Sequence, residues 1–355
     1  MKILHILNHI RETGNGIVNV AIDLACLQAQ AGHQVGVASV GGGYQALLER
    51  YGVSHFSLDQ TRRPKHLLLA AQKYRRLLGD FQPDIVHAHM MTGAILARVL
   101  RYSRTYTIIS TVHNEFQRSA TWMGLADGVI AVSQAVAEAM ERRGIPAAKL
   151  KVVRNGTLGS PRCSAEAQSQ DQQLCRPAIA TVAGMYPRKG IADLIAAFEQ
   201  VAPHIPTAHL YLIGDGPHRA EFETQSKKTT VANRIHFEGF QPNPLSYLRS
   251  ADVFVLASHR EPFGLVLSEA REAGCAIVAS QVDGIPEALD QGQAGLLVPT
   301  KNPMALAEAL MKLLSNQETL RFWREQAGKN IDWLSAQRVY AETQAVYEEF
   351  LHQRP

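Results

Sequence analysis

The chain of 355 residues is long for a single hydrophobic core and natural for two domains of ordinary size. Hydrophobic residues make up 46% of it and charged residues 19%, which excludes a globally disordered chain. The net charge of +4 conceals a basic first part, which suggests either contact with something anionic or solvated helix faces. The main basic cluster is Arg62, Arg63, Lys65, His66, Lys73, Arg75 and Arg76.

The first part of the chain alternates short apolar runs with amphipathic segments, the pattern of a doubly wound α/β sheet. The run Lys2–Leu7 predicts the first strand, and a glycine-bearing loop leads from it into a helix over Ile17–Ala31. Further strands are predicted at Val35–Val40, Asp84–Ala88, Thr107–Val112, Gly128–Val132 and Lys151–Val153, and helices at Thr92–Arg101 and Gln134–Arg143. Ser133 is the expected N-cap of the last of these helices.

Residues 159–176 lose this periodicity and are rich in Ser, Gln, Pro and Gly, so they predict an interdomain linker. Beyond it, strands are predicted at Ala178–Ala183, His209–Ile213, Ile235–Phe237, Val253–Ala257, Ala276–Ser280 and Ala294–Val298, and helices at Ile191–Val201, Leu245–Ser250 and Gly264–Ala273. Asn302 followed by Pro303 predicts a further helix start, and helices are expected from there to about Leu351. We therefore expect domains over residues 1–158 and 177–332, followed by a C-terminal helix within 333–355.

The cysteines and the apolar runs of the sequence predict the compartment of the protein and whether it spans a membrane. Its cysteines are Cys26, Cys163, Cys175 and Cys275. They form neither a CxxC pair nor a Cys/His ligand cluster, so we expect a reducing compartment and no zinc site. The apolar run in Met1–His9 is too short for an export signal, and no stretch approaches the ~20 apolar residues that span a bilayer. A cytoplasmic protein is expected, at most resting on the inner face of a membrane.

The strongest motif is EPFGLVLSE, from Glu261 to Glu269, directly after the predicted strand VFVLA. A helix is expected to begin near Gly264, between the two acids. Because Gly264 has no Cβ, a ligand can approach the N–H groups of the first helical turn, where negative charge is favoured. Carboxylates that accept hydrogen bonds from hydroxyls, beside N–H groups for an anion, suit a sugar diphosphate. The alternative is an ordinary capped helix with two surface acids.

A second motif is the basic turn Arg188-Lys189-Gly190, between a predicted strand and a helix. Two cations there can neutralise a departing diphosphate without a metal ion, because Arg grips phosphate bidentately and Lys acts as a point charge. Taken alone, the turn is equally a basic surface loop. No metal and no cofactor are therefore expected.

Weaker signals follow three other strands. Gly14-Asn-Gly16 lacks the GxGxxG spacing of a dinucleotide fingerprint, which argues against NAD, although its backbone can still approach a diphosphate. His113, just past the strand TIISTV, is a candidate hydrogen-bond or proton partner for a sugar hydroxyl. His87 and His89 are expected to be structural core residues. The loop Asp283-Gly-Ile-Pro-Glu287 is expected to lead into a helix.

Together these residues resemble the retaining glycosyltransferases of the GT-B fold, in particular the large GT4-type family, over nearly the whole chain. The segment from Glu261 to Glu269 matches the family's E-x7-E signature, and Arg188-Lys189-Gly190 resembles its basic diphosphate-binding turn. Supporting segments are Gly214-Asp-Gly-Pro217, Asp283-Gly-Ile-Pro-Glu287, Asp84–His89 (DIVHAH) and Val153-Arg-Asn-Gly156. The resemblance implies two Rossmann-like doubly wound domains that face a cleft, and a final helix that packs back on the first domain.

The resemblance also implies roles for donor-binding residues. Glu261 would contact hydroxyls of the donor sugar, and Glu269 would accept hydrogen bonds from the ribose. The residues whose N–H groups would hold sugar and phosphate are Phe263, Gly264 and Leu265.

By the same resemblance, Lys189 would stabilise the leaving diphosphate, Gly16 would lie near the phosphates and His113 near the sugar. The family usually carries Gly-Arg five residues before its lysine, where this chain has Ala183-Gly184. Arg188 is the candidate substitute for the missing arginine.

The expected reaction is transfer of a hexose or related sugar from a UDP- or GDP-sugar to a glycan or lipid-linked acceptor. Cell-surface polysaccharide or lipopolysaccharide synthesis is the expected setting, with peripheral contact to an anionic membrane. The alternatives are an epimerase or a glycan phosphorylase on the same architecture, against which the E-x7-E segment counts, and a sugar-nucleotide-binding regulator. Nucleic-acid binding leaves the motifs of the second domain without a purpose, so no nucleic acid is expected.

Overall fold

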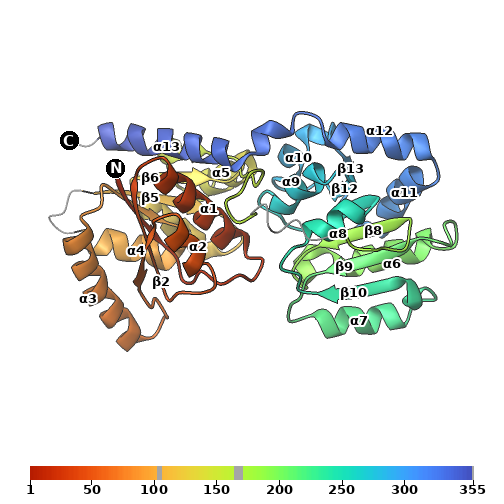
Figure 1. The fold of residues 1–355 in the computed structure, drawn as a ribbon, viewed down its shortest axis with the longest axis horizontal. Helices are drawn as coiled ribbons and strands as arrows, with labels where there is room; N and C mark the ends of the chain where they lie inside the picture. The colour runs from red at the N-terminus through yellow and green to blue at the C-terminus, as the bar shows by residue number, and fades with distance from the viewer. Residues whose placement is uncertain (102–105, 164–170, 354–355) are drawn as a thin grey trace. The chain divides into compact units, whose positions relative to one another are not determined.

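The structure is a computed structural model that describes residues 1–101, 106–163 and 171–353. It divides into two compact units, Met1–Cys163 with Leu334–Pro355, and Ser164–Trp333 (Figure 1). Each unit is a parallel β-sheet covered by helices. Residues 164–170 of the predicted linker lie outside the described residues. Among the described residues, no helix combines the length and the apolar character that crossing a membrane requires.

The first unit is built on a seven-stranded sheet with the order β3-β2-β1-β4-β5-β6-β7. Its strands are β1 (Lys2–Ile6), β2 (Gln34–Ser39), β3 (Ser54–Ser57), β4 (Ile85–Ala88), β5 (Thr107–Val112), β6 (Gly128–Ala131) and β7 (Leu150–Val152). Its helices are α1 (Gly16–Gln30), α2 (Gln45–Arg50), α3 (Pro64–Phe81), α4 (Met91–Val99), α5 (Gln134–Glu141) and α13 (Ala336–His352). The strand order reverses between β1 and β4, which makes this the topological switch point of the sheet.

Helix starts in this unit follow the capping chemistry of the sequence. The side chain of Asn15 accepts a hydrogen bond from the Ile17 N–H, so Gly16 is the first residue of α1 and no longer part of the loop. The predicted cap of α5 is confirmed, because the Ser133 hydroxyl accepts from the Val136 N–H at 3.1 Å.

The last helix, α13, completes the core of the first unit although it comes from the far end of the chain (Figure 1). Its buried Val346, Tyr347 and Phe350 pack with Ile3 and Ile109 of the central strands. The chain returns to this unit at Leu334, whose carbonyl accepts from the Leu158 N–H at 3.1 Å. The first core is therefore closed only when the whole chain is present.

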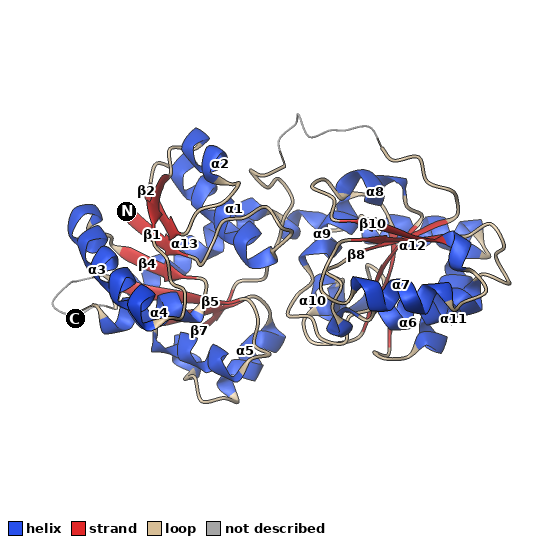
Figure 2. Ribbon diagram, turned by 90° about the horizontal axis from the view of Figure 1, so that it is seen from below, coloured by secondary structure: helices blue, strands red, loops and turns tan. Residues whose placement is uncertain are grey.

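The second unit has a six-stranded sheet with the order β10-β9-β8-β11-β12-β13. Its strands are β8 (Ala178–Val182), β9 (His209–Ile213), β10 (Ile235–Gly239), β11 (Val253–Leu256), β12 (Ala276–Ser280) and β13 (Leu296–Val298). Its helices are α6 (Ile191–Val201), α7 (Arg219–Lys227), α8 (Leu245–Ser250), α9 (Leu265–Glu272), α10 (Ile285–Ala288), α11 (Pro303–Leu314) and α12 (Gln317–Ala327). Figure 2 shows α8 on one face of this sheet, with α6 and α11 on the other.

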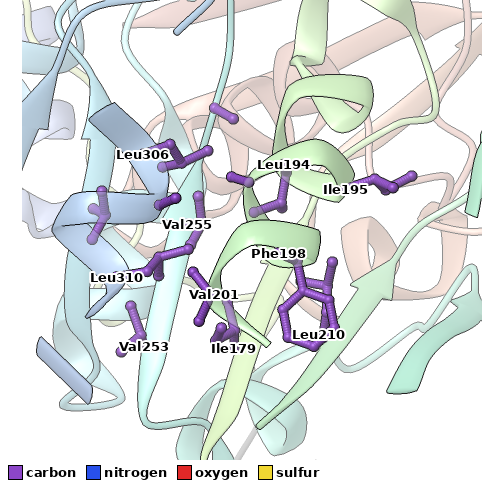
Figure 3. Close-up of a cluster of buried hydrophobic side chains, with 14 of the residues drawn as sticks. Ile179, Leu194, Ile195, Phe198, Val201, Leu210, Val253, Val255, Leu306 and Leu310 are labelled. Atoms are coloured by element: carbon purple, nitrogen blue, oxygen red, sulfur yellow. The ribbon is translucent and has the colours of Figure 1, made fainter. Parts of the chain in front are cut away.

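The core of the second unit lies between its sheet and the helices α6 and α11 (Figure 3). Phe198 and Val201 of α6 face Leu210 of β9, and Leu310 of α11 lies beside Val255 of β11. All five side chains are fully buried. Strands covered on both faces need continuous apolar runs, which is why VFVLA and AIVAS identify β11 and β12 in the sequence.

The structure differs from the predicted elements at short segments and at one long helix, α3, which has 18 residues. The elements α2, β3, α3 and α7 are not among the predicted ones, whereas α10 is the helix expected at the loop that begins with Asp283, and it starts within that segment, at Ile285. The stretch predicted as helical after Asn302 consists of α11, α12 and α13, and the Asn302 side chain caps α11 through the Ala305 N–H. Strand β3 has four residues and reads SHFS, so it does not show the alternation that identifies a longer strand.

Candidate functional site

Loops from three neighbouring strands meet at the switch point of the second sheet. Strand β11 pairs in parallel with β8 on one side and with β12 on the other. Lys189 follows β8, Glu261 follows β11 and Asp283 follows β12. Because carboxyl ends of parallel strands share one edge of a sheet, the sheet order brings these distant residues together.

Lys189 and Glu261 form the centre of this group. The Lys189 Nζ donates to Glu261 Oε2 in a close ion pair, and the two side chains are 16% and 10% exposed. The Ser258 hydroxyl donates to the same carboxylate oxygen at 3.1 Å. The charge of Lys189 is therefore balanced by Glu261 within the unit. An anionic ligand that binds Lys189 has to displace the Glu261 carboxylate.

The loop that carries Glu261 is anchored from the neighbouring strand. The Glu261 N–H donates to Asp283 Oδ2 at 2.9 Å, and the Gly284 N–H donates to the Glu261 carbonyl at 3.1 Å. Arg260 Nε also donates to Asp283 Oδ2, at 2.9 Å. These bonds fix the backbone on both sides of the Glu261 side chain.

The basic turn that carries Lys189 is a 3-10 turn, Pro187–Lys189, packed against the end of β11. It ends at Gly190, whose φ is +67°, and a Cβ at this position would lie 1.8 Å from the Ala257 carbonyl oxygen. The His259 N–H donates to the Arg188 carbonyl at 2.7 Å. A glycine is required here because the turn touches the backbone of the next strand.

Helix α9 opens between the two acids of the E-x7-E segment. Gly264 is its N-cap, with φ of +88°, and brings no side chain to occupy the first N–H groups of the helix. Phe263 is 1% exposed, and its ring meets Trp333 edge to face, with centroids 6.2 Å apart. Leu265 is the first residue of α9, and Glu269 lies half-buried in its second turn. The helix start can therefore accept an anion beside Glu261.

The position of the missing family arginine is filled by a neighbouring ring. A Cβ at Gly184 would lie 3.0 Å from Cε2 of Tyr186, so a larger side chain at 184 requires the Tyr186 ring to move. Arg188 is half-buried in the turn beside Lys189. The substitution of Arg188 for that arginine stays a prediction.

The other two predicted site residues belong to the first unit. His113 follows β5, and its Nε2 lies 3.1 Å from Nδ1 of His89. Burial lowers the pKa of His113 to about 3, so the ring is neutral at ordinary pH and is a hydrogen-bonding group rather than an acid. Gly16 lies in the first turn of α1. The remaining seven predicted site residues lie in the second unit.

Of the described residues, His5, His87 and His89 form the group whose spacing could suit a metal ion, with ligand atoms within 4.8 Å of one another. Their ring nitrogens all have hydrogen-bond partners. His87 bonds to the Tyr347 hydroxyl at 2.5 Å and to the Thr111 hydroxyl at 2.6 Å, while His5 and His89 bond to each other. A metal would have to displace these bonds. The prediction that His87 and His89 are core residues is confirmed by their burial, 1% and 2% exposed.

Sequence reasoning did not find several polar groups around the centre. Ser258 and His259 stand between VFVLA and Glu261, and His259 Nε2 lies 2.6 Å from Asp193 Oδ2 of α6. The segment that begins with Asp283 was singled out, but the sequence did not show that Asp283 anchors the Glu261 backbone. Their position directly after strands indicated that they lie near the site. Which partner each of them bonds to depends on the strand order, which the sequence does not show.

Comparison with known proteins adds family information to this geometry. The sequence model of the glycosyl transferases group 1 matches residues 165–330, and that of glycosyltransferase family 4 matches residues 14–157. The chain is 29% identical to a glycogen synthase of Mycobacterium tuberculosis, over 79% of this chain and 73% of the relative. It is 30% identical to a phosphatidyl-myo-inositol mannosyltransferase of Mycobacterium leprae, over 69% of this chain and 67% of the relative.

Similarity to solved structures extends over nearly the whole chain. HepE of Anabaena in complex with UDP-glucose aligns with a TM-score of 0.80 at 20% sequence identity, covering 98% of this chain and 99% of the other. This likeness assigns the GT-B fold, with two Rossmann-like domains.

Proposed function

Because the chain belongs to the group 1 glycosyltransferases, we propose that it moves a hexose or related sugar from a nucleoside diphosphate sugar to a glycan or lipid-linked acceptor, with retention of anomeric configuration. The observation that carries the proposal is the ion pair of Lys189 and Glu261 beside the open start of α9. The UDP-glucose bound by HepE supports a UDP- or GDP-sugar as the donor.

The donor loses its nucleoside diphosphate in the transition state, which builds negative charge on the leaving oxygen. Lys189 and the N–H groups at the start of α9 stabilise that charge, with Arg188 as a further cation. These groups supply positive charge without a metal ion, so we propose a metal-independent reaction. Activity that persists in EDTA supports this, and activity restored only by a divalent cation contradicts it.

Donor binding also changes the partners of Glu261. When the diphosphate attracts Lys189, the Glu261 carboxylate is released to accept hydrogen bonds from sugar hydroxyls, while the Ser258 hydroxyl keeps it in place. The N–H groups of Phe263, Gly264 and Leu265 hold sugar and phosphate. Glu269, one turn further along α9, accepts from the ribose.

The acceptor hydroxyl attacks from the face that the diphosphate leaves, and its proton passes to the leaving phosphate oxygen. No carboxylate nucleophile is assigned. His113 contributes a hydrogen bond to the sugar, in keeping with its neutral ring, and Gly16 lies near the phosphates.

The class of acceptor is proposed from an exposed face of helix α3 in the first unit. Helix α3 exposes Leu68 and Leu69, 69% and 57% exposed, on the same face as Lys65, Lys73 and Arg76. Such a face suits an anionic bilayer, so we propose a lipid-linked or anionic glycan acceptor, a precursor of surface polysaccharide or lipopolysaccharide, at the cytoplasmic side of a membrane.

A donor screen followed by an assay tests the proposed function. A panel of UDP- and GDP-sugars is first compared by thermal shift, because a bound donor stabilises the folded chain. Release of free nucleoside diphosphate is then measured with the stabilising donor. We expect Lys189→Met to lower kcat by at least about 100-fold, since it removes a charge from the transition state. The exposed Lys227→Met, on α7, is the matched control and keeps wild-type activity.

The other outcomes identify the alternatives. A donor that stabilises the chain but never releases its diphosphate indicates a sugar-nucleotide-binding regulator. A donor whose sugar is altered while the diphosphate bond stays intact indicates an epimerase. Either result overturns the proposed transfer.

A further inference from the structure

A line of buried polar side chains lies behind His113 in the first unit. His113 Nε2 is 3.1 Å from His89 Nδ1, and His89 Nε2 is 2.9 Å from His5 Nδ1. At the far end, His5 Nε2 is 2.7 Å from the amide oxygen of Gln28, on α1. Gln28 and His5 are fully buried and His89 is 2% exposed, so each link is made within the protein. We call these four residues the histidine chain.

The direction of each hydrogen bond in the histidine chain follows from the one before it. The amide oxygen of Gln28 can only accept, so the proton of His5 is on Nε2 and its Nδ1 is a lone pair. That lone pair accepts from Nε2–H of His89, whose Nδ1 then accepts from Nε2–H of His113. Because each link holds one proton, the bond to Gln28 at one end determines the tautomer of His113 at the other.

We propose that Gln28, His5 and His89 are positioning residues that hold His113 as the tautomer with its proton on Nε2 and a lone pair on Nδ1. In this tautomer His113 offers an acceptor to a donor-sugar hydroxyl. That last step rests on the proposed function, whereas the tautomer itself does not.

Two further observations agree with a chain of neutral rings. Burial lowers the pKa of His5 to about 4, and it lowers the pKa of His89 well below the usual value. A charged ring would carry two N–H groups and set donor against donor within the histidine chain. His87 stacks on His89, with centroids 4.1 Å apart, but both its nitrogens bond to the hydroxyls of Tyr347 and Thr111. It therefore lies beside the histidine chain without interrupting it.

The test reads the tautomer directly, without a donor. Two-bond ¹H–¹⁵N spectra of the full chain with ¹⁵N-labelled histidine distinguish Nε2–H from Nδ1–H, and a His113→Gln variant assigns the signal. We expect wild-type His113 to show Nε2–H in at least about tenfold excess, because the other tautomer leaves buried nitrogens unpaired. Gln28→Leu removes the acceptor at the end, and we expect His113 then to populate both tautomers.

Thr111→Val is the matched control, because it removes the buried hydroxyl bonded to His87, next to the histidine chain, and leaves every link intact. It keeps the wild-type tautomer. Should Gln28→Leu not fold, Gln28→Met replaces it, because methionine has a similar length and offers no strong acceptor, so His113 must again populate both tautomers. Nδ1–H or a mixture in the wild type, or an unchanged tautomer in Gln28→Leu, overturns the proposal. So does Zn²⁺ that shifts the signals of His5, His87 and His89 together, which identifies a metal site.

Kinetics then connect the tautomer to the reaction. We expect kcat/KM of Gln28→Leu to fall in proportion to the fraction of His113 in the other tautomer, while Thr111→Val matches the wild type. A loss of activity in Gln28→Leu with an unchanged tautomer indicates a merely structural role and overturns the proposal. If the wild type transfers no sugar at all, the proposed function fails and the tautomer result still stands.

Discussion

Gly190 is the residue where the basic turn touches the end of β11, and its geometry gives a test at a single position. Its φ of +67° is strained for any other residue, and a Cβ would lie 1.8 Å from the Ala257 carbonyl oxygen. Gly190→Ala therefore has to displace the turn that carries Lys189. We expect the free energy of unfolding to fall by more than about 2 kcal/mol and donor binding to weaken.

The control for this prediction is Gly274→Ala in the same unit. Gly274 has a φ of +74°, but a Cβ there would meet nothing within 4 Å, so only the backbone strain is incurred. We expect it to cost about 1 kcal/mol and to leave donor binding unchanged. Urea denaturation and donor titration of both variants measure the difference. Equal losses of stability would show that close contact at Gly190 does not matter.

Single site residues were predictable where they share a short segment. Glu261 and Glu269 could be identified because one strand-to-helix connection carries both, with Pro-Phe-Gly between them. The ion pair of Glu261 with Lys189, 72 positions away, could not be derived without the strand order. The histidine chain escaped prediction for the same reason: His5 lies in β1 and His89 directly follows β4, and nothing in either segment shows that their rings meet.

Helix α3 is an element whose two faces differ in kind. Its inner face buries Ala70, Tyr74 and Leu78, which hold it to the first unit. Its outer face exposes Leu68 and Leu69 among cations. The sequence showed only the cations, and it left open whether they meet an anion or only solvent. Exposed leucines within a basic face favour a surface that is both apolar and anionic.

Liposome co-sedimentation tests this face. We expect the chain to bind vesicles that contain anionic lipid, less strongly at high salt, and Leu68→Ser with Leu69→Ser to reduce binding at least about tenfold because two apolar anchors are lost. Phe322→Ser is the control, since Phe322 is 51% exposed on α12 of the second unit. Binding that is equal for neutral and anionic vesicles, or insensitive to the leucines, rejects α3 as the contact.

Elements were predictable in proportion to their burial rather than their length, since the largely exposed α3 has 18 residues and was not predicted. Long helices such as α6 and buried strands such as β5 have the bounds that their apolar patterns predicted. The starts of α1 and α9 each shift by one residue, because Asn15 and Gly264 act as N-caps. Short elements such as β3 form only because neighbouring strands offer an edge to pair with.

At the scale of the whole molecule, the alternation of strands and helices predicted the α/β class and two Rossmann-like sheets. Both sheets repeat one order, in which the first strand of each unit lies beside the fourth strand, β4 or β11. The composition break after Gly159 indicated where the chain changes unit, although Arg162 still pairs with Asp23 of α1 at 2.8 Å. Pairing over such distances is set by tertiary packing, which local composition does not show.

The buried histidines make the free energy of unfolding depend on pH. Burial lowers the pKa of His5 to about 4 and of His113 to about 3, and it lowers the pKa values of His87 and His89 strongly. In the unfolded chain these rings titrate near 6.5. Between pH 6.5 and 4 the unfolded state therefore binds protons that the folded state does not, and the free energy of unfolding falls as the pH falls.

From pH 7 to pH 5.5 we expect each buried histidine to remove about 1 kcal/mol from the free energy of unfolding. Asp23 opposes this trend, because burial raises its pKa and the folded state gains its proton first. Urea denaturation at both pH values measures the sum. His87→Gln should reduce the loss by about 1 kcal/mol, whereas the exposed His204→Asn should leave the loss unchanged. A wild-type chain equally stable at both pH values would mean that the rings are protonated in the fold, which the bond directions in the histidine chain forbid.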